Sequence, residues 1–217
     1  MPPVATPPVA TVSRRRLLAA LAALPVLSIA VPGCAASGGS RGWPAWQLLC
    51  DSSLSEDGRM IDRTHADQRS TSEGQSYALF FALAANDAER FARVLRWTQD
   101  NLAGGDMAAQ LPAWLWGRDA KGGWSVLDPN PASDSDLWLA YALLEAARLW
   151  RQPEYQRIAM AMLAQVRERE IAILEGLGPM LLPGPHGFLA DGATRVNPSY
   201  LPLPLLRRFA AVDRSGP

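Results

Sequence analysis

Residues 71–85 read TSEGQSYALFFALAA, and residues 132–150 read ASDSDLWLAYALLEAARLW. In both stretches a few polar and acidic residues precede a run that is apolar on almost every side. A helix that is apolar all round is usually buried on all sides, so the two runs predict two interior helices. Ser72 is a favourable N-cap for the first helix, and Asp134 or Asp136 can cap the second. Each predicted helix therefore begins beside a carboxylate.

Two further stretches are apolar on one side only. Residues 87–102, DAERFARVLRWTQDNL, carry apolar side chains at helical spacing and charges elsewhere, and glycines 104 and 105 end the pattern. Residues 153–170, PEYQRIAMAMLAQVRERE, have the same one-sided character. A buried helix followed each time by a one-sided helix is what an inner ring wrapped by an outer ring requires. The sequence therefore predicts an all-α fold, an α/α toroid.

The remaining segments predict shorter elements and connections. A first helix is expected from Trp43, and residues 106–131 are expected to form a long connection. Residues 176–196 are rich in Gly and Pro and predict an irregular loop with a small hairpin. Residues 197–200, NPSY, are expected to open a third apolar helix, in which the prolines fall near the first turn.

The N-terminus has the pattern of an export signal. The basic residues 13–18, SRRRLL, precede a short apolar run and a small-residue exit. We expect residues 1–36 to be a signal peptide of the twin-arginine type, with the general secretory route as the alternative. Cys34 lies in a sequence similar to a lipoprotein cleavage site, and ordinary cleavage near it is the competing interpretation. Residues 37–42 are then a linker, and the mature protein is periplasmic or secreted, with membrane contact only through a lipid anchor.

Composition excludes several classes of function. The chain has 217 residues, with 21 basic and 21 acidic side chains, so it offers no electrostatic case for binding nucleic acid. His65 and His186 are too few and too far apart in sequence for a metal cluster, and we expect neither metal nor cofactor. Cys34 and Cys50 do not make a disulfide framework, and Cys50 is expected to be a small buried hydrophobe.

Chemistry is expected where the two interior helices begin. If these helix starts point at one place, Glu73 and Asp134 face each other, with Tyr77 on the face of Glu73 one turn later. The alternative is that the acids only cap their helices. Trp114 and Trp116 alternate, so in extended chain they share a face and could stack on a sugar ring. Packing in the core is their alternative role.

Four motifs carry a resemblance to a known family. TSEGQSY, LPAWLWG, ASDSDLWLAYALLEAARLW and NPSYLP occur in the order in which glycoside hydrolase family 8 has them. The resemblance runs from about Trp43 to about Leu206. It identifies residues 43–217 as the N-terminal part of a family 8 catalytic domain, with Ser135 and Leu139 as mild departures from the family pattern. The fold that it implies is an (α/α)6 toroid.

The resemblance also implies an activity and site residues. By matching position, Glu73 is the proton donor, and Asp134 is the nucleophile or the group that positions the sugar. Tyr77, Trp114, Trp116, Asp136, Arg195 and Tyr200 are expected to contact substrate. The expected reaction is endo-acting, inverting hydrolysis of β-1,4-glucan linked to bacterial cellulose synthesis, with the cellulose synthase complex as a partner.

The resemblance implies a domain about twice as long as this chain, with the general-base aspartate in its second half. We therefore expect an incomplete toroid, exposed apolar helix faces that favour association, and weak or no activity. The alternatives are a glycan-binding remnant without catalysis, a relative acting on xylan or chitosan, and a helical lipoprotein without a ligand.

Overall fold

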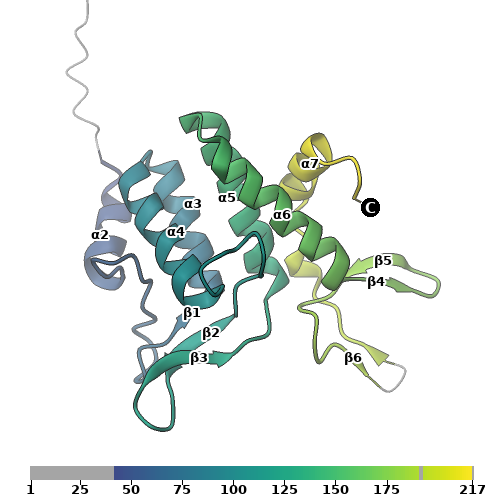
Figure 1. Ribbon diagram of the computed structural model, residues 1–217, viewed down its shortest axis with the longest axis horizontal. Helices are drawn as coiled ribbons and strands as arrows, with labels where there is room; N and C mark the ends of the chain where they lie inside the picture. Colours follow the sequence, from purple (N-terminus) through teal and green to yellow (C-terminus); the bar gives the residue numbers. More distant parts are fainter. Residues whose placement is uncertain (1–41, 191–192, 217) are drawn as a thin grey trace, which may run out of the picture. The chain divides into compact units, whose positions relative to one another are not determined.

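The computed structural model describes residues 42–190 and 193–216, so the predicted signal peptide and nearly all of the predicted linker lie outside the described residues (Figure 1). Residues from Gly42 onward form one unit built mainly from helices. The helices are α2 (Pro44–Ser53), α3 (Ser72–Ala84), α4 (Ala88–Leu102), α5 (Ser133–Trp150), α6 (Pro153–Arg169) and α7 (Leu203–Val212), with a short 3-10 helix η1 (Pro198–Tyr200). None of the described helices is long and apolar enough to cross a lipid bilayer.

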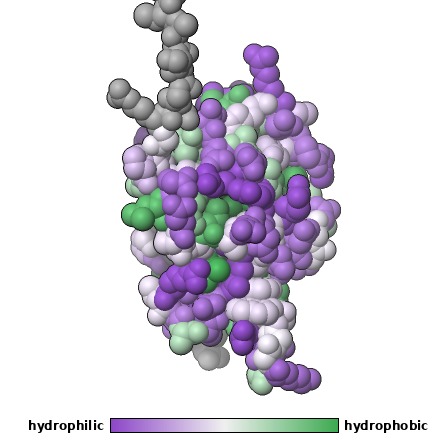
Figure 2. All heavy atoms as spheres, turned by 90° about the vertical axis from the view of Figure 1, so that its left-hand side faces the viewer, coloured by the Kyte–Doolittle hydropathy of each residue, from purple (hydrophilic) through white to green (hydrophobic). Residues whose placement is uncertain are grey.

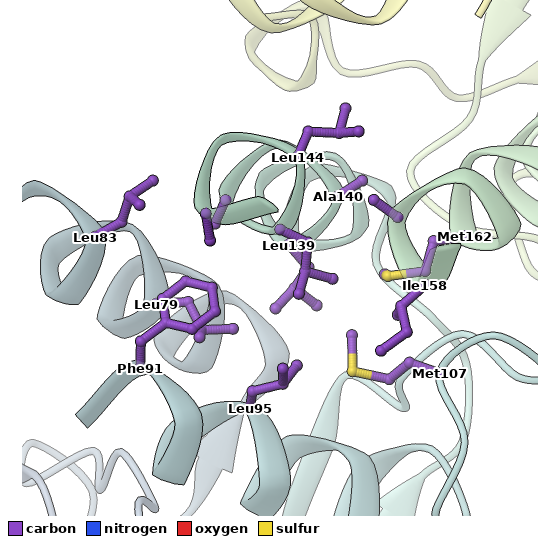
Figure 3. Close-up of a cluster of buried hydrophobic side chains, with 14 of the residues drawn as sticks. Leu79, Leu83, Phe91, Leu95, Met107, Leu139, Ala140, Leu144, Ile158 and Met162 are labelled. Atoms are coloured by element: carbon purple, nitrogen blue, oxygen red, sulfur yellow. The ribbon is translucent and has the colours of Figure 1, made fainter. Parts of the chain in front are cut away.

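The core lies where α3, α4, α5 and α6 meet. Short connections make antiparallel pairs of α3 with α4 and of α5 with α6, and α3 also packs along α5. Figure 3 shows apolar side chains from all four helices converging on one centre, together with Met107 from the segment after α4. Leu79, Phe91, Leu139 and Met162 are fully buried there. Because each helix contributes one apolar face to this centre, no pair of them could bury its apolar surface alone.

The predicted alternation of helices is confirmed. The two interior helices, α3 and α5, pack against each other, while α4 and α6 cover them with one apolar face and expose charged residues on the other. Burial of α3 is less complete than the sequence suggested, because Tyr77 is 42% exposed. Cys50 is 5% exposed within the core, which confirms its expected role as a small buried side chain.

The capping residues differ from those predicted. Thr71, not Ser72, is the N-cap of α3, and its hydroxyl accepts a hydrogen bond from the N–H of Gly74 at 3.1 Å. Helix α5 begins at Ser133, earlier than expected, and no side chain caps it. The reason lies in the tertiary structure, because the Ser133 N–H and hydroxyl are bonded to carbonyls of residues 182 and 183, after strand β5. Both aspartates of α5 therefore lie inside its first turn.

Short strands occupy much of the segments expected to be loops. Strands β1 (Ser70–Thr71), β2 (Leu115–Arg118) and β3 (Trp124–Asp128) form an antiparallel sheet in that order. Two hairpins follow, β4 (Ile171–Leu174) with β5 (Gly178–Leu181), and β6 (Leu189–Ala190) with β7 (Ala193–Thr194). The long connection at 106–131 is thus partly a hairpin, and residues 176–196 take part in two hairpins rather than one.

The third apolar helix is confirmed, but it starts later than expected. Residues 198–200 form the 3-10 turn η1, and α7 follows at Leu203 with Leu205 and Phe209 buried. Arg208 of α7 donates to Glu145 of α5 at 2.5 Å, which attaches α7 to the inner helix. A largely apolar cavity of about 570 Å³ lies between α6, α7 and the β4–β5 hairpin, and none of the predicted site residues lines it.

The face shown in Figure 2 is that of the α2 side of Figure 1. Hydrophilic side chains predominate on it, and apolar side chains reach the surface only in small groups between them (Figure 2). This distribution is ordinary for the surface of a folded domain.

Candidate active site

The first turns of α3 and α5 are joined directly. The hydroxyl of Ser135 lies 2.7 Å from the hydroxyl of Ser72 and 2.8 Å from the carbonyl oxygen of Ala132, and both serines are buried. The Ser72 N–H donates to the carbonyl of Trp114 at 3.0 Å, just before strand β2. Two helix starts and the sheet are therefore held at one point, as the sequence predicted for the helices.

Glu73 and Asp134 lie next to these two serines and influence each other. Burial raises the pKa of Asp134 from 3.8 to about 6, and the negative charge of Glu73 acts in the same direction. The N–H groups of Asp134 and Ser135 oppose this shift but are weaker. Oδ1 of Asp134 is buried and receives no hydrogen bond from the described residues. The structure thus brings together the two acids that the sequence singled out.

Two tyrosines belong to the same site. The pKa of Tyr77 is raised by burial and by the charges of Asp134 and Glu73, and the pKa of Tyr200 is raised by the same causes. Electrostatic effects of this kind require proximity, so η1 carries Tyr200 to the two helix starts. Trp138, which the sequence analysis did not select, meets Tyr77 edge-on at 6.0 Å between ring centroids. Its only signal was its position one turn after Asp134.

Asp136 is not available to a substrate. Its side chain is fully buried, and its carboxyl interacts with that of Glu170, which is also fully buried. The expectation that Asp136 contacts substrate is therefore not supported. Asp136 lies on the inward side of the α5 first turn, where it meets Glu170. Glu170 itself was missed, because it reads as the last of several charges at the end of a one-sided helix.

The two predicted platform tryptophans have different surroundings. The Trp116 ring is stacked on that of Trp124, with centroids 4.8 Å apart and planes 11° apart, and Trp97 meets it edge-on at 5.2 Å. The Arg59 guanidinium lies 4.5 Å from the Trp116 centroid. A register shift between Leu115 and Trp116 breaks the regular alternation from which a shared face was inferred. Trp114 remains half-buried beside Ser72, to which its carbonyl is bonded.

Arg195 has no connection to the two acids in the structure. It follows strand β7, its side chain is exposed, and its N–H donates to the carbonyl of Phe188 at 2.9 Å. Within the described part of the chain it forms no ion pair. Its expected contact with substrate stays a prediction.

The site offers proton transfer and aromatic contacts. The site contains two carboxyl groups, and burial together with the charge of Glu73 raises the pKa of Asp134, which is the kind of shift that acid–base catalysis uses. Over residues 42–190 and 193–216, no three His, Cys, Asp or Glu side chains are placed to hold a metal ion. The chemistry that the carboxyl groups of Glu73 and Asp134 can perform is protonation and charge stabilisation.

The chain is similar to curated proteins named endoglucanase. An endoglucanase of Xanthomonas axonopodis pv. citri (strain 306) is 52% identical over 211 residues, covering 94% of this chain and 54% of the relative. An endoglucanase of Escherichia coli (strain K12) is 50% identical over 167 residues, covering 77% of this chain and 45% of that protein. The chain thus spans about half the length of the curated relatives it matches.

The chain is also similar to solved structures. An endo-1,4-D-glucanase from Vibrio fischeri ES114 is similar with a TM-score of 0.74 and 49% identity, over 77% of this chain and 48% of that one. A cold-adapted family 8 xylanase shares the fold at 20% identity, with a TM-score of 0.57, over 80% of this chain and 47% of the xylanase. These similarities confirm the expected (α/α)6 toroid fold, of which the described helices form a part. Residues 23–216 match the family described as Glycosyl hydrolases family 8, and the chain belongs to that family.

Proposed function

We propose that this chain carries the acid side of an active site for endo-acting hydrolysis of β-1,4-glucan. The observation that carries the proposal is the meeting of Glu73 and Asp134 at the starts of α3 and α5, held by the contact between Ser72 and Ser135. The relatives called endoglucanase support the choice of substrate class. Xylan and chitosan remain neighbouring substrates within the family resemblance.

In this proposal Glu73 protonates the departing glycosidic oxygen. Asp134 is ionised above pH about 6 and stabilises positive charge at the anomeric carbon of the sugar beside it. Tyr77 and Trp138 form an aromatic edge next to the acids, against which a sugar ring can pack. Each role uses a group that lies in the site, and none requires a metal ion or cofactor.

Inversion of configuration needs a second carboxylate that activates water on the opposite face of the sugar. Asp136 and Glu170 are fully buried, so neither can hold that water. The family resemblance assigns the base to an aspartate in the second half of the domain, outside the region matched here. A test of the acid side of the site can therefore use an added nucleophile in place of that base.

Azide provides that test. In an inverting site, azide attacks the anomeric carbon of a cello-oligosaccharide from the α face, the β-glycosidic C–O bond breaks, and the proton of Glu73 passes to the departing oxygen. The products are an α-glycosyl azide and a shorter oligosaccharide, which carbon and proton NMR distinguish from the β-azide. We expect the α-azide from the wild-type chain and none from Glu73→Gln.

The matched control is Glu89→Gln, because Glu89 also lies in the first turn of a helix but is exposed. It should form the azide at the wild-type rate. Equal formation by Glu73→Gln would remove Glu73 from the mechanism, and a β-azide product would contradict inversion.

A glycan-binding role without catalysis is the second candidate, because no described carboxylate is placed to activate water. It predicts a tryptophan fluorescence change on titration with cellopentaose and no product with or without azide. A helical lipoprotein without a ligand predicts no response at all.

The proposal includes export of the chain to the periplasm or beyond the cell, supported by the basic and apolar pattern of residues 13–31. Association with a cellulose synthase complex is proposed on the family resemblance alone. Fractionation of cells that express the tagged chain, and labelling of Cys34 with a radioactive fatty acid, would test the location and the lipid anchor.

A further inference from the structure

Glu170 is a buried acid at a position where an acid is costly. It is the C-cap of α6 and directly precedes strand β4, and its side chain is fully buried although Glu168 and Arg169 are exposed. Asp136, in the first turn of α5, is also fully buried. In the described part of the chain, neither oxygen of either carboxyl group receives a hydrogen bond from an N–H or O–H donor. The two groups are therefore each other's polar partners.

Two buried carboxyl groups in contact cannot both be ionised without a neighbouring cation, because each charge loses its hydration and repels the other. A carboxyl that keeps its proton can donate to its neighbour, which supplies the missing hydrogen bond. Burial raises the pKa of Glu170 to about 8, and burial together with Glu170 raises the pKa of Asp136 well above its ordinary range.

The charged groups that act on this pair come from three helices. Asp134 on α5 acts against ionisation of both members, and Glu73 on α3 acts against ionisation of Asp136. Arg169, at the end of α6, favours ionisation of Glu170. The negative charges of the candidate active site thus favour retention of a proton by the pair.

The pair lies at a junction that fixes the start of α5. The carbonyl of Glu170 accepts from the N–H of Leu182 at 2.8 Å, and the carbonyl of Leu182 accepts from the hydroxyl of Ser133 at 2.6 Å. Ser133 directly precedes Asp134. The end of α6 and the start of α5 are therefore connected through residue 182 and through the two carboxyl groups.

We propose that Asp136 and Glu170 retain at least one proton between them at neutral pH and act as positioning residues for Asp134. A protonated pair holds the first turn of α5 by a hydrogen bond and leaves Asp134 as the ionised group of that turn. This inference rests on the proposed function only for the catalytic role of Asp134. Nothing in its test requires substrate, so it can fail while the glucanase proposal stands, and the reverse.

The test compares the full chain with Asp136→Asn/Glu170→Gln, in which two amides replace the carboxyl groups without changing their shape. Folding of the wild-type chain takes up at least one proton at this pair between pH 5 and 7, because the unfolded chain has released it. For each unit by which the pH rises in this range, the unfolding equilibrium constant of the wild type should therefore increase by a factor at least ten times that of the double variant. Glu168→Gln, an exposed change on the same helix, should follow the wild type. Parallel pH dependence in wild type and double variant would overturn the proposal.

Positioning has its own readout, the titration of Asp134 followed by carbon NMR of labelled aspartate. Two amides keep a hydrogen bond between the two side chains, so in the double variant the titration of Asp134 should stay as sharp as in the wild type. Asp136→Ala/Glu170→Ala, which removes the hydrogen bond, should shift and broaden it. An Asp134 titration that the alanine variant leaves unchanged in midpoint and width would overturn the positioning role.

A further measurement is independent of whether the double variants fold. In the single variant Asp134→Asn, infrared spectra in heavy water should retain the C=O band of a protonated carboxyl group at pH 7. Its absence at pH 7 would also overturn the proposal.

Discussion

The hydroxyl groups of Ser72 and Ser135 lie 2.7 Å apart and connect the first turns of two interior helices that are 63 residues apart in sequence. Each serine is the immediate neighbour of an acid of the candidate site, Glu73 in one helix and Asp134 in the other. The contact therefore determines the spacing of the two acids more directly than the packing of the apolar faces below it.

Replacing Ser135 with alanine should destabilise the protein by about 1–3 kcal/mol, because the buried Ser72 hydroxyl no longer accepts the hydrogen bond from Ser135. Urea unfolding measures this loss. Ser52→Ala, which removes an exposed hydroxyl, should change stability by less than about 0.5 kcal/mol. In the double variant Ser72→Ala/Ser135→Ala the two losses should be less than additive, and strict additivity would argue against a direct interaction.

The raised pKa of Asp134 makes stability depend on pH. The folded protein binds this proton more tightly than the unfolded chain does, because the folded pKa is about 6 against 3.8. The resulting stabilisation is present at pH 4 and is lost as the pH rises through 6. Since Asp134 is partly exposed, we expect the wild type to lose about 1–2 kcal/mol relative to Asp134→Asn between pH 4 and 7.

Urea midpoints at four pH values for both proteins would measure that difference. Asp100→Asn, on an exposed part of α4, serves as the control and should parallel the wild type. A constant difference between wild type and Asp134→Asn across the range would contradict the raised pKa.

The Asp134→Asn variant should change the pKa of two tyrosines and leave the pKa of a third unchanged. The charge of Asp134 contributes to the raised pKa of both Tyr77 and Tyr200, whereas burial alone raises the pKa of Tyr155. In Asp134→Asn the pKa of Tyr77 and of Tyr200 should therefore fall, and that of Tyr155 should not change. Titration of ring-labelled tyrosine by NMR separates the residues, and an unchanged Tyr200 would place η1 away from the site.

The tryptophans make a prediction about glycan binding. Trp116 is occupied on its face by Trp124, while Trp114 adjoins Ser72 and the acid site. On titration with cellopentaose, Trp114→Phe should lose most of the fluorescence response and Trp116→Phe should keep it. Loss of the response in Trp116→Phe alone would support the stacking platform inferred from the sequence.

Local sequence was sufficient for most of the helices. The two runs at 71–85 and 132–150 are apolar on nearly every side, and such runs have few alternatives to an interior helix. One-sided periodicity in residues 87–102 and 153–170 likewise predicted covering helices. Strands β1, β2 and β3 were missed because they are short and because their pairing depends on which segments the helices bring together.

The sequence predicted the two acids of the candidate site but not the residues that surround them. Glu73 and Asp134 were identified by their place at the start of apolar helices and by the motifs that contain them. Glu170 could not be found, because the sequence shows only one more charge in RERE at the end of a one-sided helix. Asp136 was misjudged for the related reason that its burial involves Glu170, which comes from far along the chain.

The amino-acid sequence by itself determined the interior helices, the acids at their starts and the family, because periodicity and motif order are local properties of the chain. Tertiary structure alone decided which acids face solvent and which face each other. Asp134 and Asp136 are two residues apart on one helix, yet Asp134 is partly exposed at the candidate site and Asp136 is enclosed with Glu170. The physical reason is that a first turn points its successive side chains in different directions, and only the packed neighbours determine which of those directions is solvent.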